Sequence, residues 1–403
     1  MKNRARKWLP WLALAALLTV QGLTLVELRP RILGGEVDFT AFYSAARVVA
    51  EGRGADLYKF DTQREFQRDF PARRTPLLFY HPPFELLLFL PLAWLPYVPA
   101  YAAWMALNLG VLACLAWLPH PYADVFPRFR GLLPLVLALA FFPITVALMQ
   151  GQDSILLLCV FTLAWMALRR GQSFHAGCIL ALGLFKFQFV LPFMVALAVR
   201  RKWKALKGFL FTGLGLGLVS LVPVGWPGAR SYVEFLLEIN QHLAYGTIRP
   251  VSMPNLRGLM AALGTGLPVL WLSVTTAILS LCLLALVVRY WPPEEHRAAD
   301  SLDLAFAVNL IATLLVSYHL NVHDLALLFL AMLLVVRYLV ATSGHRRPAG
   351  RALLACLLLL FFPPLLMPSD ATMPPPVVWV LLVMVGALVS ELRAASRLHL
   401  SAA

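Results

Sequence analysis

Residues 132–149 read LLPLVLALAFFPITVALM and contain no charged residue. A helix of this length, at 1.5 Å per residue, is about 27 Å long, which suits the hydrocarbon core of a bilayer. Residues 9–26, LPWLALAALLTVQGLTLV, form a second uncharged run. Basic residues precede this second run, but no small-residue cleavage pattern follows it, which favours a retained membrane helix over a removed signal peptide.

The composition of the whole chain agrees with these two runs. Of the 403 residues, 60% are hydrophobic and only 13% are charged, whereas soluble domains carry about a quarter charged residues. The chain lacks the polar surface that a water-soluble core needs, so the sequence predicts an all-α polytopic membrane protein with about 10–12 transmembrane helices. The candidate spans are 8–28, 98–118, 131–149, 154–168, 175–185, 188–199, 206–225, 266–290, 302–318, 322–341, 350–366 and 377–392.

The formal net charge of +14 could indicate a nucleic-acid partner. The basic residues concentrate in short loops between apolar segments, however, and no soluble basic domain is evident. We therefore expect no nucleic acid as a partner. The cysteines all lie in apolar segments without metal-ligand spacing, so they are interpreted as small core residues rather than disulfides or ligands.

Two of the candidate spans, 175–185 and 188–199, are too short to cross a bilayer alone. They flank Lys186, and basic residues lie at both ends of the unit. This pattern predicts a hairpin of broken helices whose turn enters the membrane, because irregular backbone is tolerated there only where it lines a cavity.

The distribution of basic loops predicts an orientation in the membrane. Loops rich in Lys and Arg alternate with short loops that lack both, and the positive-inside rule then puts both termini in the cytoplasm. Residues 29–97 become a first extracytoplasmic loop and residues 226–265 a second one, within a single membrane domain of residues 1–403. We expect a bacterial cytoplasmic (inner) membrane.

Polar and ionisable residues gather on the predicted outer side. Such groups are costly at membrane depth and commonly mark a functional site, so their clustering predicts an active site that faces outward. The residues include Asp38, His81, Gln150, Gln152, Asp153, Lys186, Asn255, Arg257, His319, His323 and Asp324.

The first loop has regular features of its own. From Phe39 to Ala50 apolar residues recur at helical spacing, which predicts an amphipathic interfacial helix. Residues 79–96 are apolar but contain four prolines, which predicts a broken surface or re-entrant segment.

Several motifs, taken in their order along the chain, resemble glycosyltransferase family 87 (DUF2029), the polyprenol-phosphate-mannose-dependent mannosyltransferases. The resemblance covers roughly residues 30–340. The motifs are DFTAFYSAARVVAEGRGADLY (38–58), FYHPPF (79–84), GQDSILL (151–157), LGLFKFQFVLPF (182–193), SMPNLRGL (252–259) and SYHLNVHDLALL (317–328).

The resemblance implies a GT-C fold, a bundle of membrane helices whose first outer loop carries short helices. It also implies transfer of a hexose, mannose in this family, from a polyprenyl-monophosphate donor to an extracytoplasmic glycan or glycolipid acceptor with inversion. The family's essential acidic residue matches Asp38. The chain departs from the family pattern at Tyr318 and His323, which leaves the role of that loop less defined.

The chemistry explains why these residue types matter. A partly desolvated carboxylate at the bilayer boundary suits a general base for the acceptor hydroxyl, and Asp38 is the candidate. The alternative for Asp38 is a helix N-cap. His319 is the second candidate catalytic residue, because it could assist proton transfer.

Cations are needed at the leaving phosphate, and Lys186 and Arg257 are the candidates. The alternatives for Lys186 are extension to the interface or pairing with Asp153. The expected sugar- and acceptor-binding residues are Tyr43, His81, Gln152, Asp153, Asn255, His323 and Asp324.

No cofactor is expected, and we predict metal-independent transfer. His319 and His323 have the i, i+4 spacing of a zinc pair, but the intervening residues lack the glutamate of the protease motif. The expected partners are the polyprenyl-phosphate sugar, the acceptor and membrane lipids.

Two other function classes remain open at this point: a lipid or glycan transporter or flippase, and an inactive assembly subunit. A transporter would favour an internal repeat and polar residues on both faces, and the sequence shows neither.

Overall fold

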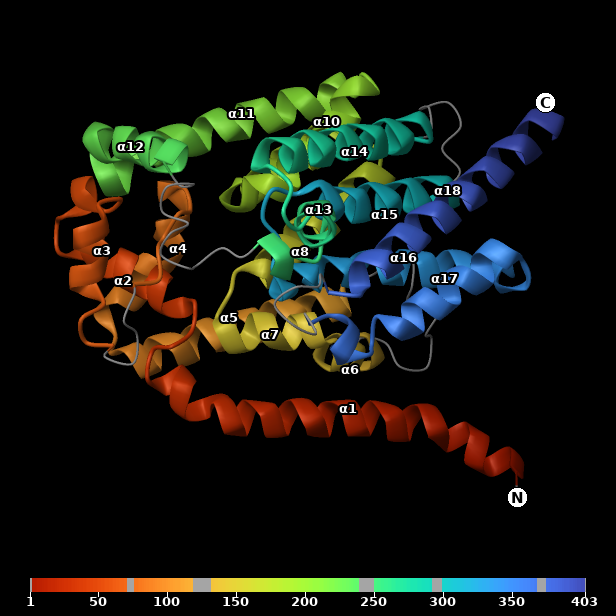
Figure 1. The fold of residues 1–403 in the computed structure, drawn as a ribbon, viewed down its shortest axis with the longest axis horizontal. Coiled ribbons are helices and arrows are strands. Elements are labelled where there is room, and N and C mark those ends of the chain that lie inside the picture. The colour runs from red at the N-terminus through yellow and green to blue at the C-terminus, as the bar shows by residue number, and fades with distance from the viewer. Residues whose placement is uncertain are drawn as a thin grey trace. The chain divides into compact units, whose positions relative to one another are not determined.

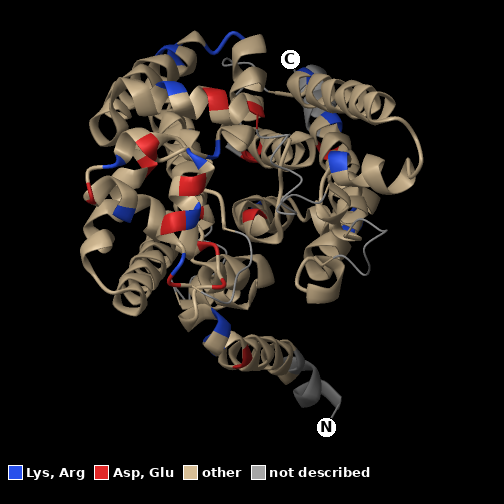
Figure 2. Ribbon diagram, turned by 60° about the vertical axis from the view of Figure 1, so that its left-hand side comes forward, with Lys and Arg blue, Asp and Glu red and all other residues tan. Residues whose placement is uncertain are grey.

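The computed structural model describes residues 2–70, 76–118, 132–238, 250–291, 299–367 and 375–402. Within these ranges every regular element is helical (Figure 1). Figure 2 shows long stretches of helix without a charged residue. The prediction of an all-α polytopic membrane protein is confirmed.

Six segments in the described residues are long and apolar enough to cross a bilayer, and two bent helix pairs raise the number to eight. Two of the three shorter apolar helices, Ser154–Arg169 and Pro348–Leu359, overlap further predicted spans. The expected 10–12 transmembrane helices therefore stay a prediction. The six segments are Pro10–Leu33, Tyr97–Trp117, Ser173–Val199, Val269–Arg289, Val322–Ala341 and Val377–Ala394.

The chain divides into two compact units, each of which is described by itself. The first unit comprises Met1–Trp117, Gly131–Ile155 and Leu214–Ile248. Its helices are α1 (Lys2–Leu33), α2 (Phe39–Ala50), η1 (Gly54–Asp56), α3 (Phe60–Phe66), η2 (Pro83–Glu85), α4 (Leu86–Phe89), η3 (Leu90–Trp94), α5 (Tyr97–Trp117), α6 (Leu132–Ala140), α7 (Phe142–Gln150) and α12 (Leu221–Glu238).

Helices α6 and α7 form a bent pair rather than the straight span predicted for residues 131–149. They meet at Phe141 with a bend of 74°, and Pro143 opens the first turn of α7. The bend frees the carbonyl of Ala140, and the buried amide of Gln21 in α1 donates to it at 2.7 Å. A side chain thus satisfies a backbone group that water cannot reach in a bilayer.

Helix α2 begins at Phe39, as the apolar spacing predicts, and its interfacial location stays a prediction. Most of its residues are buried, Phe39 and Phe42 among them. It packs against α3, α4, η3 and α5. The proline-rich segment 79–96 forms the short helices η2, α4 and η3, in agreement with the prediction of a broken segment.

The helix predicted for residues 206–225 also breaks. Helices α11 (Trp203–Val219) and α12 are bent by 92°, and Gly225 inside α12 has a φ of 64°. Residues 226–238, predicted as part of the second outer loop, are therefore helical. Residues 239–249 of that loop lie outside the described residues.

The second unit comprises Leu118–Arg130, Leu156–Gly213 and Arg249–Ala403. Helices α8 and α11 continue across the division. The helices assigned here are α8 (Ser154–Arg169), α9 (Ser173–Leu182), η6 (Gly183–Lys186), α10 (Phe187–Val199), α11, η8 (Pro250–Ser252), α13 (Leu256–Leu263), α14 (Val269–Arg289), α15 (Ala299–Val316), η10 (Val322–Leu327), α16 (Leu328–Ala341), η11 (Gly344–Arg346), α17 (Pro348–Leu359), η12 (Pro363–Leu365) and α18 (Val377–Ala402).

Helix α15 is the centre of this unit, with α10, α14, α16 and α18 packed around it. Asp303 of α15 is a deeply buried carboxylate. It accepts hydrogen bonds from Trp165 at 3.0 Å and from Arg169 at 2.8 Å. Arg337 of α16 also pairs with Asp303. These contacts join α8, α15 and α16 through a paired charge.

The predicted hairpin around Lys186 is wrong. Helices α9, η6 and α10 form one candidate span, Ser173–Val199, of 27 residues. The short 3₁₀ segment η6 tightens the helix without reversing the chain. Arg169 and residues 200–204 therefore lie beyond opposite ends of one span, and the alternation of basic and non-basic loops fails at this step.

Candidate active site

A four-residue turn, Gln150–Asp153, connects α7 to α8 and organises the candidate site of the first unit. Gly151 has a φ of 63°, a conformation that favours glycine. A Cβ at this position would lie 2.6 Å from Phe39 Cβ. From α5, Tyr101 donates to the carbonyl of Met149 at 3.1 Å and Trp104 to that of Gly151 at 2.9 Å. Two hydrogen bonds from α5 therefore hold the backbone of the turn.

Both glutamines of this turn contact Asp38. The side chain of Gln150 accepts a hydrogen bond from the Asp38 backbone N–H at 3.2 Å. The Gln152 amide donates to Asp38 Oδ2 at 2.9 Å. The carboxylate of Asp38 is half-buried, and among the described residues it forms no ion pair.

The alternative interpretation of Asp38 as a helix N-cap is not supported. Asp38 directly precedes α2, but its backbone is already helical and its side chain makes no capping hydrogen bond. The carboxylate therefore has a neutral amide as its hydrogen-bond donor, which orients it.

Tyr43 lies one turn further along α2 and is buried. Its hydroxyl donates to the carbonyl of Leu95 at 2.8 Å, and its ring stacks on Phe39. Burial raises the pKa of Tyr43 above its usual value of 10.0. The neutral hydroxyl keeps an acceptor oxygen, so the predicted role in sugar binding stays a prediction.

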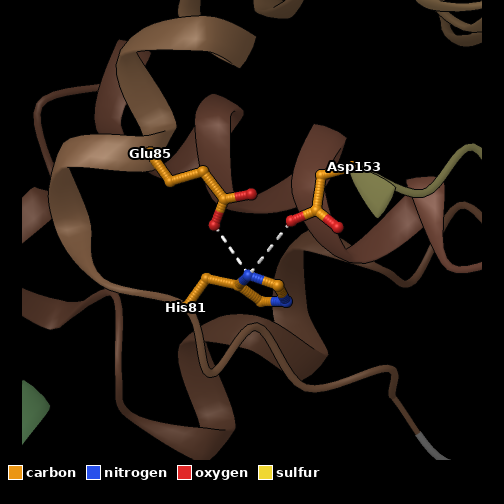
Figure 3. A group of neighbouring side chains, drawn as sticks. All are labelled: His81, Glu85 and Asp153. Carbon is orange, nitrogen blue, oxygen red and sulfur yellow. Dashed lines mark ion pairs between the residues drawn. The ribbon is translucent and has the colours of Figure 1, made fainter. Parts of the chain in front are cut away.

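His81, Glu85 and Asp153 form a buried cluster beside this turn (Figure 3). His81 Nδ1 lies 2.7 Å from Glu85 Oε2 and 3.6 Å from Asp153 Oδ2. Figure 3 shows both carboxylates pointing toward the same imidazole nitrogen. The three ligand atoms that the residues offer all lie within 4.8 Å of one another.

Sequence reasoning missed Glu85 in this cluster. His81 lies two residues before η2 and Glu85 is its last residue. Their HPPFE spacing is the signal that could have identified the pair. Asp153 is too far along the chain from either residue for any local pattern to connect them.

The backbone of His81 is fixed by a tyrosine. Tyr58 donates its hydroxyl to the His81 carbonyl at 2.7 Å. Burial raises the pKa of Tyr58 well above its usual value, and nearby Tyr232 and Glu85 raise it further. The phenol therefore stays protonated and keeps its donor role at physiological pH.

In the second unit, Lys186 and Asp324 form a buried ion pair with Nζ and Oδ1 2.6 Å apart. His323 Nε2 lies 3.5 Å from the same oxygen. Asp324 also accepts from the backbone N–H of Asn321 at 3.0 Å, in a capping box at the start of η10. Asp324 is therefore the anionic partner that the buried ammonium of Lys186 requires.

His319 lies before η10, in a non-helical segment. The i, i+4 helical geometry of a zinc pair with His323 is therefore absent. Its Nε2 lies 3.1 Å from the side-chain nitrogen of Asn321. Burial lowers the pKa of His319 to about 4, although the nearby Asp324 carboxylate raises it. The imidazole is therefore neutral at physiological pH.

Asn255 and Arg257 lie at the start of α13 and contact the segment before His319. Asn255 caps α13 by accepting from the N–H of Gly258 at 2.9 Å, and it donates to the carbonyl of Ser317 at 2.7 Å. Arg257 donates to the carbonyl of Tyr318 at 2.9 Å and lies 3.9 Å from the centroid of its ring. Asn255 is fully buried and has a structural role, whereas Arg257 is partly exposed.

The structure thus places the candidate residues in two groups. Asp38, Tyr43, His81, Gln152 and Asp153 lie in the first unit, and the other six lie in the second. A pocket that includes members of both groups stays a prediction.

A family profile described as glycosyltransferase family 87 matches residues 79–317, more than half of the chain. The chain belongs to glycosyltransferase family 87. No curated protein and no solved structure matches it.

The glycosyltransferase family assignment and the apolar helices together establish a membrane glycosyltransferase. The matched range includes His81, Gln152, Asp153, Lys186 and the Asn255–Arg257 segment. It begins after the first loop helix, so Asp38 and Tyr43 lie before it, and it ends before His319. The family match therefore does not cover Asp38, and a role for this residue must be argued from its surroundings in the structure.

Proposed function

We propose that this glycosyltransferase transfers a hexose, mannose, from a polyprenyl-monophosphate donor to a glycan or glycolipid acceptor with inversion, and that Asp38 is the general base. The observation that carries the proposal is the environment of Asp38. Its carboxylate is half-buried and oriented by the Gln152 amide at 2.9 Å, and it does not cap α2.

This arrangement suits proton transfer from an acceptor hydroxyl. Oδ2 is held by one neutral donor, so lone pairs of the carboxylate remain for a second hydrogen bond. A general base must lie within hydrogen-bonding reach of the hydroxyl whose proton it accepts, and this free acceptor position allows that contact. The acceptor oxygen then attacks the anomeric carbon, the phosphate leaves with the bonding electrons, and a single displacement inverts that carbon.

Two cations remain proposed ligands of the donor phosphate. Lys186 is already paired with Asp324 at 2.6 Å, so binding a phosphate would require that pair to be shared. Arg257 is partly exposed and oriented by the Tyr318 carbonyl, and its planar guanidinium matches two phosphate oxygens. We favour Arg257 as the primary phosphate ligand. The transfer step proposed here requires no metal ion.

The side of the membrane is part of the proposal. Basic residues at the start of α1 favour a cytoplasmic N-terminus. Because α1 crosses once, Asp38 then lies on the extracytoplasmic face of a bacterial cytoplasmic membrane. This placement does not depend on the orientation of the later spans.

The test is transfer from a radiolabelled polyprenyl-phosphate mannose by purified wild-type protein and by Asp38→Asn. Removal of a general base lowers the rate by about 10²–10⁴-fold, and we expect a loss in this range with an unchanged melting temperature. Glu36→Gln is the matched control, because Glu36 lies two residues away and pairs with exposed Arg31. The control should transfer at the wild-type rate.

Three outcomes would contradict parts of the proposal. Substantial transfer by Asp38→Asn would remove the base assignment. Use of a polyprenyl-phosphate glucose in preference to the mannose donor would correct the sugar, and a product with the donor's anomeric configuration would exclude a single displacement.

A further inference from the structure

We propose that His81, Glu85 and Asp153 bind one divalent transition-metal ion, zinc by the chemistry of the donors, and that this ion positions the turn that holds Asp38. The site goes beyond the proposed transfer step, since the role proposed for the ion is to position this turn. The first observation is convergence: one imidazole nitrogen and two carboxylate oxygens lie within 4.8 Å of one another (Figure 3).

The distances among the ligand atoms are compatible with a metal ion between them. His81 Nδ1 lies 2.7 Å from Glu85 Oε2 and 3.6 Å from Asp153 Oδ2. Zinc binds nitrogen and carboxylate oxygen at about 2.0–2.2 Å, which separates tetrahedral ligand atoms by about 3.4 Å. The observed separations bracket that value, so small side-chain shifts are enough to bring all three ligands to the ion.

The donor set selects the class of metal. An imidazole ligand favours zinc and the later transition metals, whereas magnesium and calcium prefer oxygen ligands alone. The two carboxylates together offer four oxygens, so the three residues can supply four or five ligands without water. If a carboxylate binds through both of its oxygens, the coordination sphere is filled by these residues, as a positioning ion requires.

The ligands are rigid before any ion binds. The side chains of Glu85 and Asp153 are completely buried, and that of His81 is 9% exposed. The imidazole contacts the rings of Phe42, Phe79 and Tyr80, with centroids 5.0, 5.5 and 5.3 Å away. Such a packed aromatic shell fixes the ring and excludes water, which strengthens binding.

The ion would join two segments that the chain itself does not connect locally. His81 precedes η2 and Glu85 ends it, whereas Asp153 ends the turn whose Gln152 donates to Asp38. A metal ion at this point therefore fixes the turn relative to the first-loop helices. Its effect on transfer is one of positioning, through Gln152.

The experiment measures metal content and does not depend on activity. The full chain is purified in detergent without chelator, dialysed against zinc and then against buffer, and measured by inductively coupled plasma mass spectrometry. We expect one zinc per chain in the wild type, and less than a tenth of that in Glu85→Gln and Asp153→Asn. His175→Asn is the control, because His175 is exposed on α9, and it should retain the wild-type content.

A second measurement covers the case in which the ligand variants do not fold. Chelator-treated wild-type protein is titrated with Co²⁺, which should give visible absorption of a low-coordinate site, and zinc should raise its melting temperature. Absence of bound zinc together with an unchanged melting temperature would overturn the proposal. So would full zinc content in the two carboxylate variants, which would place the ion elsewhere.

Asp38→Asn separates this inference from the proposed function. That variant should lose transfer and keep its zinc. Loss of zinc with retained transfer in the ligand variants would show an ion that does not position Asp38, and it would refute that part of the inference alone.

Discussion

Asp38 in the first unit and Asp324 in the second are both held carboxylates, but their partners differ in charge. Asp38 is half-buried and accepts from a neutral amide at 2.9 Å. Asp324 is 2% exposed and pairs with the Lys186 ammonium at 2.6 Å. A neutral donor orients a carboxylate and leaves its charge available, whereas a buried ammonium neutralises it. The comparison supports the proposed catalytic role of Asp38 and a stabilising role of the pair that Asp324 forms with Lys186.

The largest expected effect is the loss of stability in Asp324→Asn. Removing one member of a buried ion pair leaves the other charge uncompensated, which costs about 3–5 kcal/mol. We expect that decrease in the free energy of unfolding, measured by chemical denaturation in detergent. The matched control is Asp56→Asn, because Asp56 pairs with Lys59 at the same 2.6 Å but with both side chains exposed. That control should show no measurable change.

An equal decrease in the free energy of unfolding in Asp324→Asn and Asp56→Asn would contradict the stabilising role of the buried pair. The double variant Lys186→Met, Asp324→Leu tests the same role further. Two apolar side chains need no desolvation of charge, so we expect the double variant to be more stable than Asp324→Asn.

The second effect concerns Gln152, whose amide orients Asp38. A hydrogen bond to a charged group contributes about 1.5–3 kcal/mol, so we expect Gln152→Leu to lower kcat by about 10–100-fold while KM stays within about twofold. Steady-state transfer kinetics measure this split. Gln172→Leu is the control, because Gln172 is exposed in the turn before α9. A higher KM with unchanged kcat would indicate that Gln152 binds the acceptor instead.

The smallest effect concerns the pH dependence of stability. The folded protein holds the pKa of His319 at about 4, below the usual 6.5, so the unfolded chain binds a proton first as the pH falls. The stabilising contribution is present above pH 6.5 and is lost as the pH falls to 4. Because the side chain is partly exposed, we expect about 1–2 kcal/mol.

Denaturation of the wild type at pH 7, 5.5 and 4.5 measures this loss, and the free energy of unfolding of His319→Gln should depend less on pH. If its pH dependence equals that of the wild type, another group causes the acid sensitivity. Between pH 6 and 8 the same variant should not change the shape of the pH–rate profile, because the imidazole is already neutral in this range.

The helices could largely be predicted because their cause is local. The uncharged runs correspond to α1, α5, α14 and the first half of α18, and the spacing from Phe39 predicts α2. The breaks were less evident, although local signals exist. Pro143 marks the start of α7 after the bend, and Gly225 provides the positive φ inside α12.

The site contacts have no local cause, and for this reason the sequence left them open. Lys186 and Asp324 are 138 residues apart, and only the packing of the second unit brings them together. Gln152 and Asp38 are 114 residues apart. The residue types indicated that these side chains need partners, but their pairing depends on tertiary structure.

The turn Gln150–Asp153 contacts Asp38 through Gln152 and His81 through Asp153. Because four residues are too few to bend independently, an acceptor that shifts Asp38 also shifts the oxygen facing His81. Thermodynamic linkage then requires reciprocity: if zinc changes acceptor affinity by some factor, the acceptor changes zinc affinity by the same factor. Comparing acceptor titrations with and without the ion would therefore measure how stiff this short connection is.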